Sequence, residues 1–67
     1  MTPNKIKALL IENNVRQREI AAELGVTPGT VSAAISGDPK YRSRRIHEAV
    51  SARVKKPIRQ LWPKLYA

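Results

Sequence analysis

The chain has 67 residues, no cysteine, and a formal net charge of +8 that arises from 13 basic and 5 acidic residues. A chain this short forms a single small domain over residues 1–67, and without cysteine it has neither a disulfide framework nor thiolate metal ligands. No apolar run approaches the ~20 residues that span a bilayer, and residues 1–15 lack the pattern of a secretory signal. The composition therefore favours a cytoplasmic protein without a membrane partner.

The basic charge is concentrated in the second half of the chain. Residues 40–67 hold nine basic residues and one acidic residue, whereas residues 1–39 hold four of each kind. Such a block is either a solvated face or a binding surface for a polyanion, and nucleic acid is the leading polyanion ahead of a membrane surface.

The first predicted helix begins at Thr2 and Pro3, a hydroxyl cap followed by a proline at the first helical position. Its inward-facing residues, spaced by three and four, are Ile6, Leu9 and Leu10. Asn13 and Asn14 favour turns, so we expect the helix to end there.

The next two helices are joined by a very short turn. The second runs over Gln17–Leu24, and Gly25 provides the positive φ that helix ends often need. Val26 is expected to be a buried turn residue, Thr27 to be the next cap, and the third helix to occupy Pro28–Ser36 before Gly37 stops it. The inward-facing residues of the pair are Ile20, Ala21, Leu24, Val31, Ala34 and Ile35.

Three of these residues indicate a helix-turn-helix rather than an ordinary helical hairpin. Ala21 is small enough for two helices to cross closely, Gly25 turns the chain, and Val31 fills the space between the helices. A helix-turn-helix presents its second helix to the major groove of DNA.

Two shorter helices complete the pattern. Ser43 caps a fourth helix over Arg44–Val54, and Pro57 begins a fifth over Ile58–Trp62. The inward-facing residues of the fourth helix are Ile46, Ala49, Val50 and Val54. Lys64–Ala67 is expected to be a loose tail. The predicted fold is all-α, with five helices around one aliphatic core that also holds Trp62.

Little in the sequence points to catalysis or to a cofactor. His47 is the only histidine and follows the inward-facing Ile46, which predicts a satisfied residue at the surface or boundary. Trp62 is expected in the core or in a dimer contact, because one aromatic residue does not make a nucleobase platform. We therefore expect no enzymatic activity, no metal, no cofactor and no small-molecule ligand.

The segment Gln17–Gly37 resembles the lambda-repressor-like family of DNA-binding domains. The matching residues are Gln17, Ala21, Gly25, Val31 and Gly37, and the resemblance in layout extends from about Ile6 to Trp62. Residues 54–66, with Trp62, Pro63 and Tyr66, are similar to the end of Ner-like regulators of transposable phages. The resemblance implies a compact five-helix domain that binds duplex DNA.

The resemblance also implies roles position by position. The expected base-reading residues are Thr27, Pro28, Gly29, Thr30, Ser32, Ala33 and Ser36. The expected phosphate-binding residues are Arg16, Gln17, Arg18, Lys40, Arg42, Arg44 and Arg45. Tyr41, inside the basic run, could donate to a phosphate or pack over the edge of the core.

Two positions depart from the family pattern. Pro28 and Gly29 stand where many relatives carry long polar side chains, so readout falls to hydroxyl groups and to the methyl groups of Thr30 and Ala33. Either the helix approaches the bases closely, or selectivity comes from DNA shape and from the basic residues that follow. Arg16 stands where relatives often have a hydroxyl cap, and it can instead reach a phosphate.

These features predict a prokaryotic or phage transcriptional regulator, a repressor, that binds duplex DNA in the nucleoid with its third helix in the major groove. A homodimer would use the Pro57–Tyr66 end or form only on DNA. The alternatives are an antitoxin, which needs an exposed apolar surface for its toxin, and an adaptor that uses a retired helix-turn-helix.

Overall fold

The computed structural model describes residues 1–66, and these residues contain helices but no strand. The helices are α1 (Pro3–Glu12), α2 (Gln17–Leu24), α3 (Pro28–Ile35), α4 (Arg44–Val54) and α5 (Ile58–Leu61). The predicted all-α, five-helix fold is confirmed. The sequence did not predict the short 3-10 helix η1 (Pro39–Tyr41), which lies between α3 and α4.

Three hydroxyl side chains fix where the longer helices begin. Thr2, Thr27 and Ser43 precede α1, α3 and α4, and each accepts a hydrogen bond from the main-chain N–H three residues later, at 3.2–3.3 Å. These bonds satisfy donors that a helix N-terminus leaves without a partner. Arg16 precedes α2 and makes no such bond, as its side chain type predicts.

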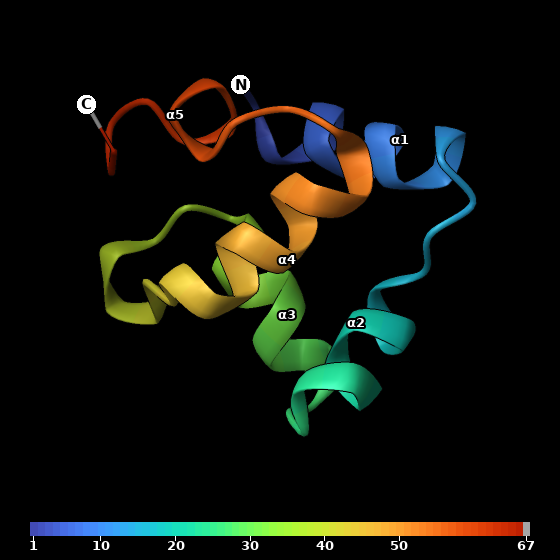
Figure 1. The fold of residues 1–67 in the computed structure, drawn as a ribbon. Coiled ribbons are helices and arrows are strands. Elements are labelled where there is room, and N and C mark those ends of the chain that lie inside the picture. Colours follow the sequence, from blue (N-terminus) through green and yellow to red (C-terminus); the bar gives the residue numbers. More distant parts are fainter. Residues whose placement is uncertain (67) are drawn as a thin grey trace.

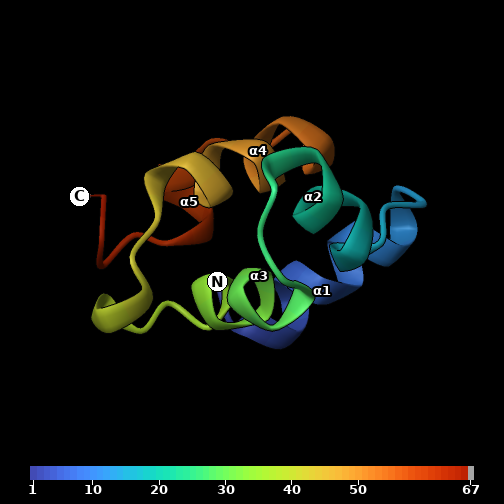
Figure 2. The same ribbon diagram turned by 90° about the horizontal axis from the view of Figure 1, so that it is seen from below.

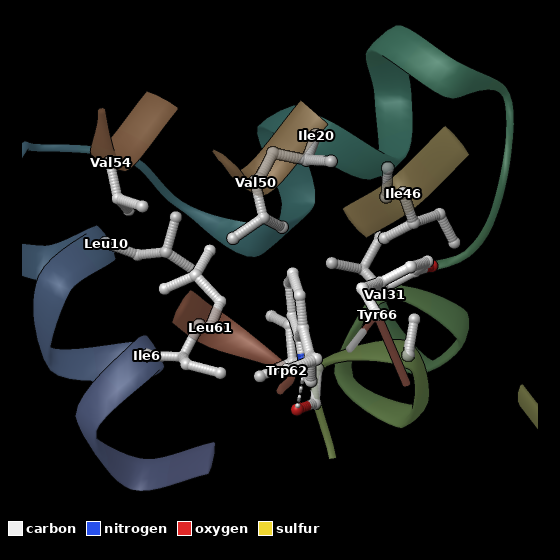
Figure 3. Close-up of a cluster of buried hydrophobic side chains, with 13 residues drawn as sticks. Ile6, Leu10, Ile20, Val31, Ile46, Val50, Val54, Leu61, Trp62 and Tyr66 are labelled. Carbon is white, nitrogen blue, oxygen red and sulfur yellow. Dashed lines mark hydrogen bonds between the residues drawn. The ribbon is translucent and has the colours of Figure 1, made fainter. Parts of the chain in front are cut away.

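In the view of Figure 1, α4 lies between α1 and α5 above and α2 and α3 below, and Figure 2 shows it along one edge of the molecule, opposite α1 and α3. Figure 3 shows side chains from these helices meeting in one cluster. Its buried members are Ile6, Leu10, Ile20, Ala21, Val31, Ala34, Ile35, Ile46, Val50, Val54, Leu61, Trp62 and Tyr66. The inner faces expected for α2, α3 and α4 are thereby confirmed in outline. Four expected core residues, Leu9, Leu24, Val26 and Ala49, are only partly buried and pack against this cluster, so Val26 is less buried than expected.

The C-terminal segment differs from the expected loose tail. Leu65 packs against the core, and Tyr66 is buried with 9% of its surface exposed. The N–H groups of both residues donate to the carbonyl of Trp62, at 3.0 and 3.1 Å, which turns the chain back onto the protein. Ala67, the last residue of the expected tail, lies outside the described residues.

His47 was expected at the surface or at the boundary of the core, but its side chain is fully buried. Its Nε2 lies 2.8 Å from the carbonyl oxygen of Ala34 and its Nδ1 lies 2.6 Å from the hydroxyl of Tyr66. Because a carbonyl only accepts, Nε2 carries the proton and Nδ1 accepts from the tyrosine. The ring stacks on Trp62 with centroids 4.0 Å apart, and Trp62 itself donates to the carbonyl of Ile35 at 3.1 Å.

The burial of polar groups is otherwise limited. Within residues 1–66, every buried side-chain nitrogen or oxygen has a hydrogen-bond partner. In the same residues, no three His, Cys, Asp or Glu side chains gather where a metal ion could be held. None of the described helices is both long and apolar enough to cross a membrane.

The burial of His47 predicts a stability that depends on pH. Desolvation by burial, reinforced by the charge of Arg42, lowers the pKa of His47 below 6.5, and the hydrogen bond to Ala34 only partly offsets this. A histidine with a lowered folded pKa stabilises the fold fully above its unfolded pKa and progressively less as the pH falls below it. We expect the free energy of unfolding to fall as the pH is lowered from 7 to 5.5, by at most about 1 kcal/mol, in denaturant titrations.

A His47→Gln variant serves as the control. It should be less stable at neutral pH but show almost no change across the same interval, because carboxylates titrate at lower pH. A wild-type protein whose stability is flat over this range would contradict the assignment of a neutral, buried imidazole.

Candidate nucleic-acid interface

Helices α2 and α3 pack together as the sequence predicts. Ala21 is 1% exposed and Val31 is fully buried, so both lie in the contact expected of them. Gly25 ends α2 with a φ of 70°, and a β-carbon there would meet no atom within 4 Å. The glycine is therefore needed for its backbone conformation and not for space. Together these residues form the helix-turn-helix geometry.

Helix α4 contacts α2 through two polar interactions. The guanidinium of Arg45 donates to the carbonyl of Leu24 at 3.3 Å, at the C-terminal end of α2 where carbonyls lack helical partners. Further along α4, Arg53 forms an ion pair with Glu23 of α2. Arg45, which was expected to bind phosphate, thus has a hydrogen-bond partner within the protein, and no local sequence pattern indicated that contact.

The outward face of α3 is exposed along its first turn. Thr27, Pro28, Gly29 and Thr30 are exposed. Further along, Ser32 and Ala33 are partly buried and Ser36 is exposed. None of the expected base-reading residues is buried, whereas Val31, Ala34 and Ile35 point into the core. Helix α3 ends at Ile35, so the expected helical residue Ser36 instead forms its C-cap.

The hydroxyl groups on this face are partly engaged within the protein. The hydroxyls of Thr27 and Thr30 bond to each other at 2.8 Å, so only one of their two protons remains for a ligand. Ser36 donates to the carbonyl of Ala33 and accepts from the N–H of Asp38. Hydrogen bonds at the two ends of α3 thus engage several of the hydroxyl groups that were expected to contact bases.

Gly29 has no structural reason to be a glycine. Its φ lies outside the left-handed region, and an added β-carbon would meet only the Thr27 hydroxyl, at 3.9 Å. Alanine would suit a helix better than glycine, by up to about 1 kcal/mol. The fold would therefore accept a side chain at position 29, and with glycine the surface of α3 is flatter there than it needs to be.

The basic run lies in the loop after α3 and in the first turn of α4. Asp38 caps η1 by accepting from the N–H of Lys40 at 2.9 Å. Lys40, Tyr41 and Arg42 are exposed, and within residues 1–66 neither Lys40 nor Arg42 forms an ion pair. Arg44 is exposed and pairs with Glu48, one turn further along α4, at 3.1 Å. Tyr41 does not pack over the core, since 54% of its surface is exposed.

The remaining candidate phosphate ligands lie at the start of α2. Arg16 and Arg18 are exposed and Gln17 is partly buried. Figures 1 and 2 both show α3 between this end of α2 and the loop that carries Lys40 and Arg42. Segments that carry exposed basic residues therefore lie on two sides of α3, an arrangement compatible with an element that enters a groove between two phosphate strands.

One residue beside the site was missed by the sequence analysis. The ring centroid of Tyr66 lies 5.1 Å from Cζ of Arg42 and 5.9 Å from Cζ of Arg44, within the range of cation–π contacts. Tyr66 is 22 or more residues away along the chain, and it carried no local signal of this role.

Comparisons with known proteins agree with this geometry. Searches against curated proteins and against solved structures give no match. A family model described as helix-turn-helix matches residues 6–42, more than half of the chain, and includes α2, α3 and the connecting turn. DNA binding of the kind found in transcription regulators is supported by that match. On this basis, and on the packing of α2 against α3, the chain belongs to the helix-turn-helix family.

Proposed function

We propose that the protein is a transcriptional repressor of the Ner-like phage type that binds specific sites in duplex DNA. Helix α3 enters the major groove, and the candidate base-reading and phosphate-binding residues act as assigned above. The observation that carries the proposal is the exposed first turn of α3, which lies between two segments that carry exposed basic residues. A protein with this arrangement acts in the nucleoid of its host.

Binding as a pair of copies formed on DNA fits the structure better than a preformed dimer. We expected a free dimer to use the Pro57–Tyr66 end, yet Trp62 and Tyr66, its two aromatic residues, lie in the core of their own chain. Two copies on adjacent half-sites would have centres about 34 Å apart, one turn of the duplex. Sedimentation with and without a palindromic duplex distinguishes the two cases.

The two alternative functions receive less support. An antitoxin needs a continuous apolar surface, but the large apolar residues that are exposed within residues 1–66 are Met1, Ile11 and Tyr41, on separate elements. An adaptor with a retired helix-turn-helix would explain the few base readers on α3, but it leaves the flanking basic charge without a purpose.

The salt dependence of DNA binding tests the proposal directly. Roughly six phosphate contacts predict a slope of about −5 in a plot of log affinity against log salt. In Lys40→Gln plus Arg42→Gln, which removes two exposed charges beside α3, the slope should fall to about −3. Fluorescence anisotropy with a random-sequence duplex measures both values.

A matched control removes the same charge elsewhere. Arg59→Ala plus Lys64→Ala changes two exposed basic residues on α5 and the segment after it, and it should leave the slope near the wild-type value. If wild-type protein shows no duplex binding at about 50 mM salt, the proposed function is wrong.

Gly29 allows stability and binding to be separated. Gly29→Ala should raise the free energy of unfolding by about 0.5 kcal/mol, because the helix is favoured and the added methyl group meets only the Thr27 hydroxyl, at an ordinary contact distance of 3.9 Å. If α3 lies close against the bases, the same methyl group should weaken binding by about tenfold, equivalent to roughly 1.4 kcal/mol. Thermal melts and anisotropy on a selected site measure the two effects.

The control for this variant is Ala8→Ser on the exposed side of α1, which should leave binding unchanged and lower the free energy of unfolding by about 0.5 kcal/mol, because serine forms helices less readily than alanine. A Gly29→Ala protein that binds DNA as tightly as the wild type would show that α3 does not approach the bases at this point.

Sequence specificity requires its own experiment. Selection of bound duplexes from a random pool should recover a pair of related half-sites, because a domain this small reads few base pairs alone. Recovered duplexes that share no base at any position would argue for binding without sequence preference.

A further inference from the structure

Tyr66 connects the basic loop to the interior of the protein. Its hydroxyl bonds to Nδ1 of His47 at 2.6 Å, and its ring meets the imidazole edge-on, at 88° with centroids 5.4 Å apart. On the other side, the same ring lies beside the guanidinium groups of Arg42 and Arg44. One side chain therefore contacts a buried histidine and two exposed cations.

The interior end of this connection is rigidly held. His47 is fully buried, stacked on Trp62, and bonded through Nε2 to the carbonyl of Ala34 in α3. Tyr66 is also fixed through its main chain, because its N–H donates to the carbonyl of Trp62 at 3.1 Å. The position of the tyrosine ring is thus set by the same core that holds α3.

The exposed end carries side chains with little other support. Arg42 has no ion-pair partner within residues 1–66, and the Arg44–Glu48 pair has both side chains more than half exposed. Exposed pairs of this kind contribute little order. A long side chain that is already restrained loses less entropy when it binds, which raises affinity without a new contact.

We propose that Tyr66 is a positioning residue for DNA binding: its ring orients Arg42 and Arg44 toward the phosphate backbone at the C-terminal end of α3. The inference rests on the proposed function. A cation over a ring face keeps its N–H groups free at the edge of the guanidinium, where a phosphate can accept from them. The C-terminal segment therefore takes part in binding without itself touching DNA.

Two substitutions separate the ring from the hydroxyl. Tyr66→Phe removes the bond to His47 but keeps the ring beside both arginines, whereas Tyr66→Leu keeps an apolar side chain and removes the ring. At about 100 mM salt, Tyr66→Leu should weaken binding to a random-sequence duplex about fivefold, and Tyr66→Phe less than twofold. Both are measured below the onset of melting, followed by circular dichroism.

A double-mutant comparison tests whether the effect passes through the arginines. On an Arg42→Gln plus Arg44→Gln background, Tyr66→Leu should have no further effect on affinity. If Tyr66→Leu binds as tightly as wild type, or if it weakens the double variant just as much as the wild type, the positioning role is overturned while the proposed function stands.

A measurement on unsubstituted protein covers the case in which Tyr66→Leu does not fold. The side-chain methylene protons of Arg42 and Arg44 should show ring-current shifts in the NMR spectrum of the free wild-type protein and of Tyr66→Phe. Ordinary shifts in the wild type would overturn the proposal. Wild-type protein that does not bind duplex DNA, yet shows the ring-current shifts, would overturn the proposed function and with it the role in binding.

Discussion

The buried imidazole of His47 connects α3 to the C-terminal segment. Among the polar residues within residues 1–66, His47 is the one that is fully buried, and its two nitrogens bond to Ala34 of α3 and to Tyr66. Leaving either nitrogen unsatisfied would cost roughly 1–3 kcal/mol. The positions of Tyr66 and of α3 are therefore coupled, because Tyr66 and Ala34 of α3 both form hydrogen bonds with the His47 ring. In a domain with so small a core, these bonds add to the apolar packing of Val31, Ala34 and Ile35 that holds α3 in place.

The helices could be predicted because their limits are local. Thr27 and Ser43 cap through bonds to residues three positions away, and Gly25 turns through its own φ, so a short window of sequence contains the whole cause. The burial of His47 has no such local cause. The helical pattern put it at the edge of the apolar face, and only the return of Trp62 and Tyr66, 15 and 19 residues later, covers it.

The same distinction applies to the candidate interface. Helical spacing was enough to expect Thr30 at the surface, because α3 has one apolar face. Residue type was enough to expect Arg42 there. Neither could reveal that Arg45 satisfies the end of α2, or that Ser36 donates its proton to Ala33. Those assignments depend on which groups the fold brings within bonding distance, and for Arg45 the partner is 21 residues away. Roles at this surface are thus divided between holding α2 and α3 in place and remaining free for a ligand.

That division bears on how such a surface would choose a DNA site. Arg45 and Arg53 connect α4 to α2, while α3 itself offers few free donors. A duplex whose groove does not fit this surface must deform, at a cost of the order of 1–6 kcal/mol for substantial bends. Because this cost depends on base sequence, a helix with a small, flat face over Gly29 can discriminate between sites through groove width and stiffness. The scarcity of long polar readers on α3 is therefore compatible with specific binding, provided that α3 keeps its position on the core, to which the bond from His47 to Ala34 contributes.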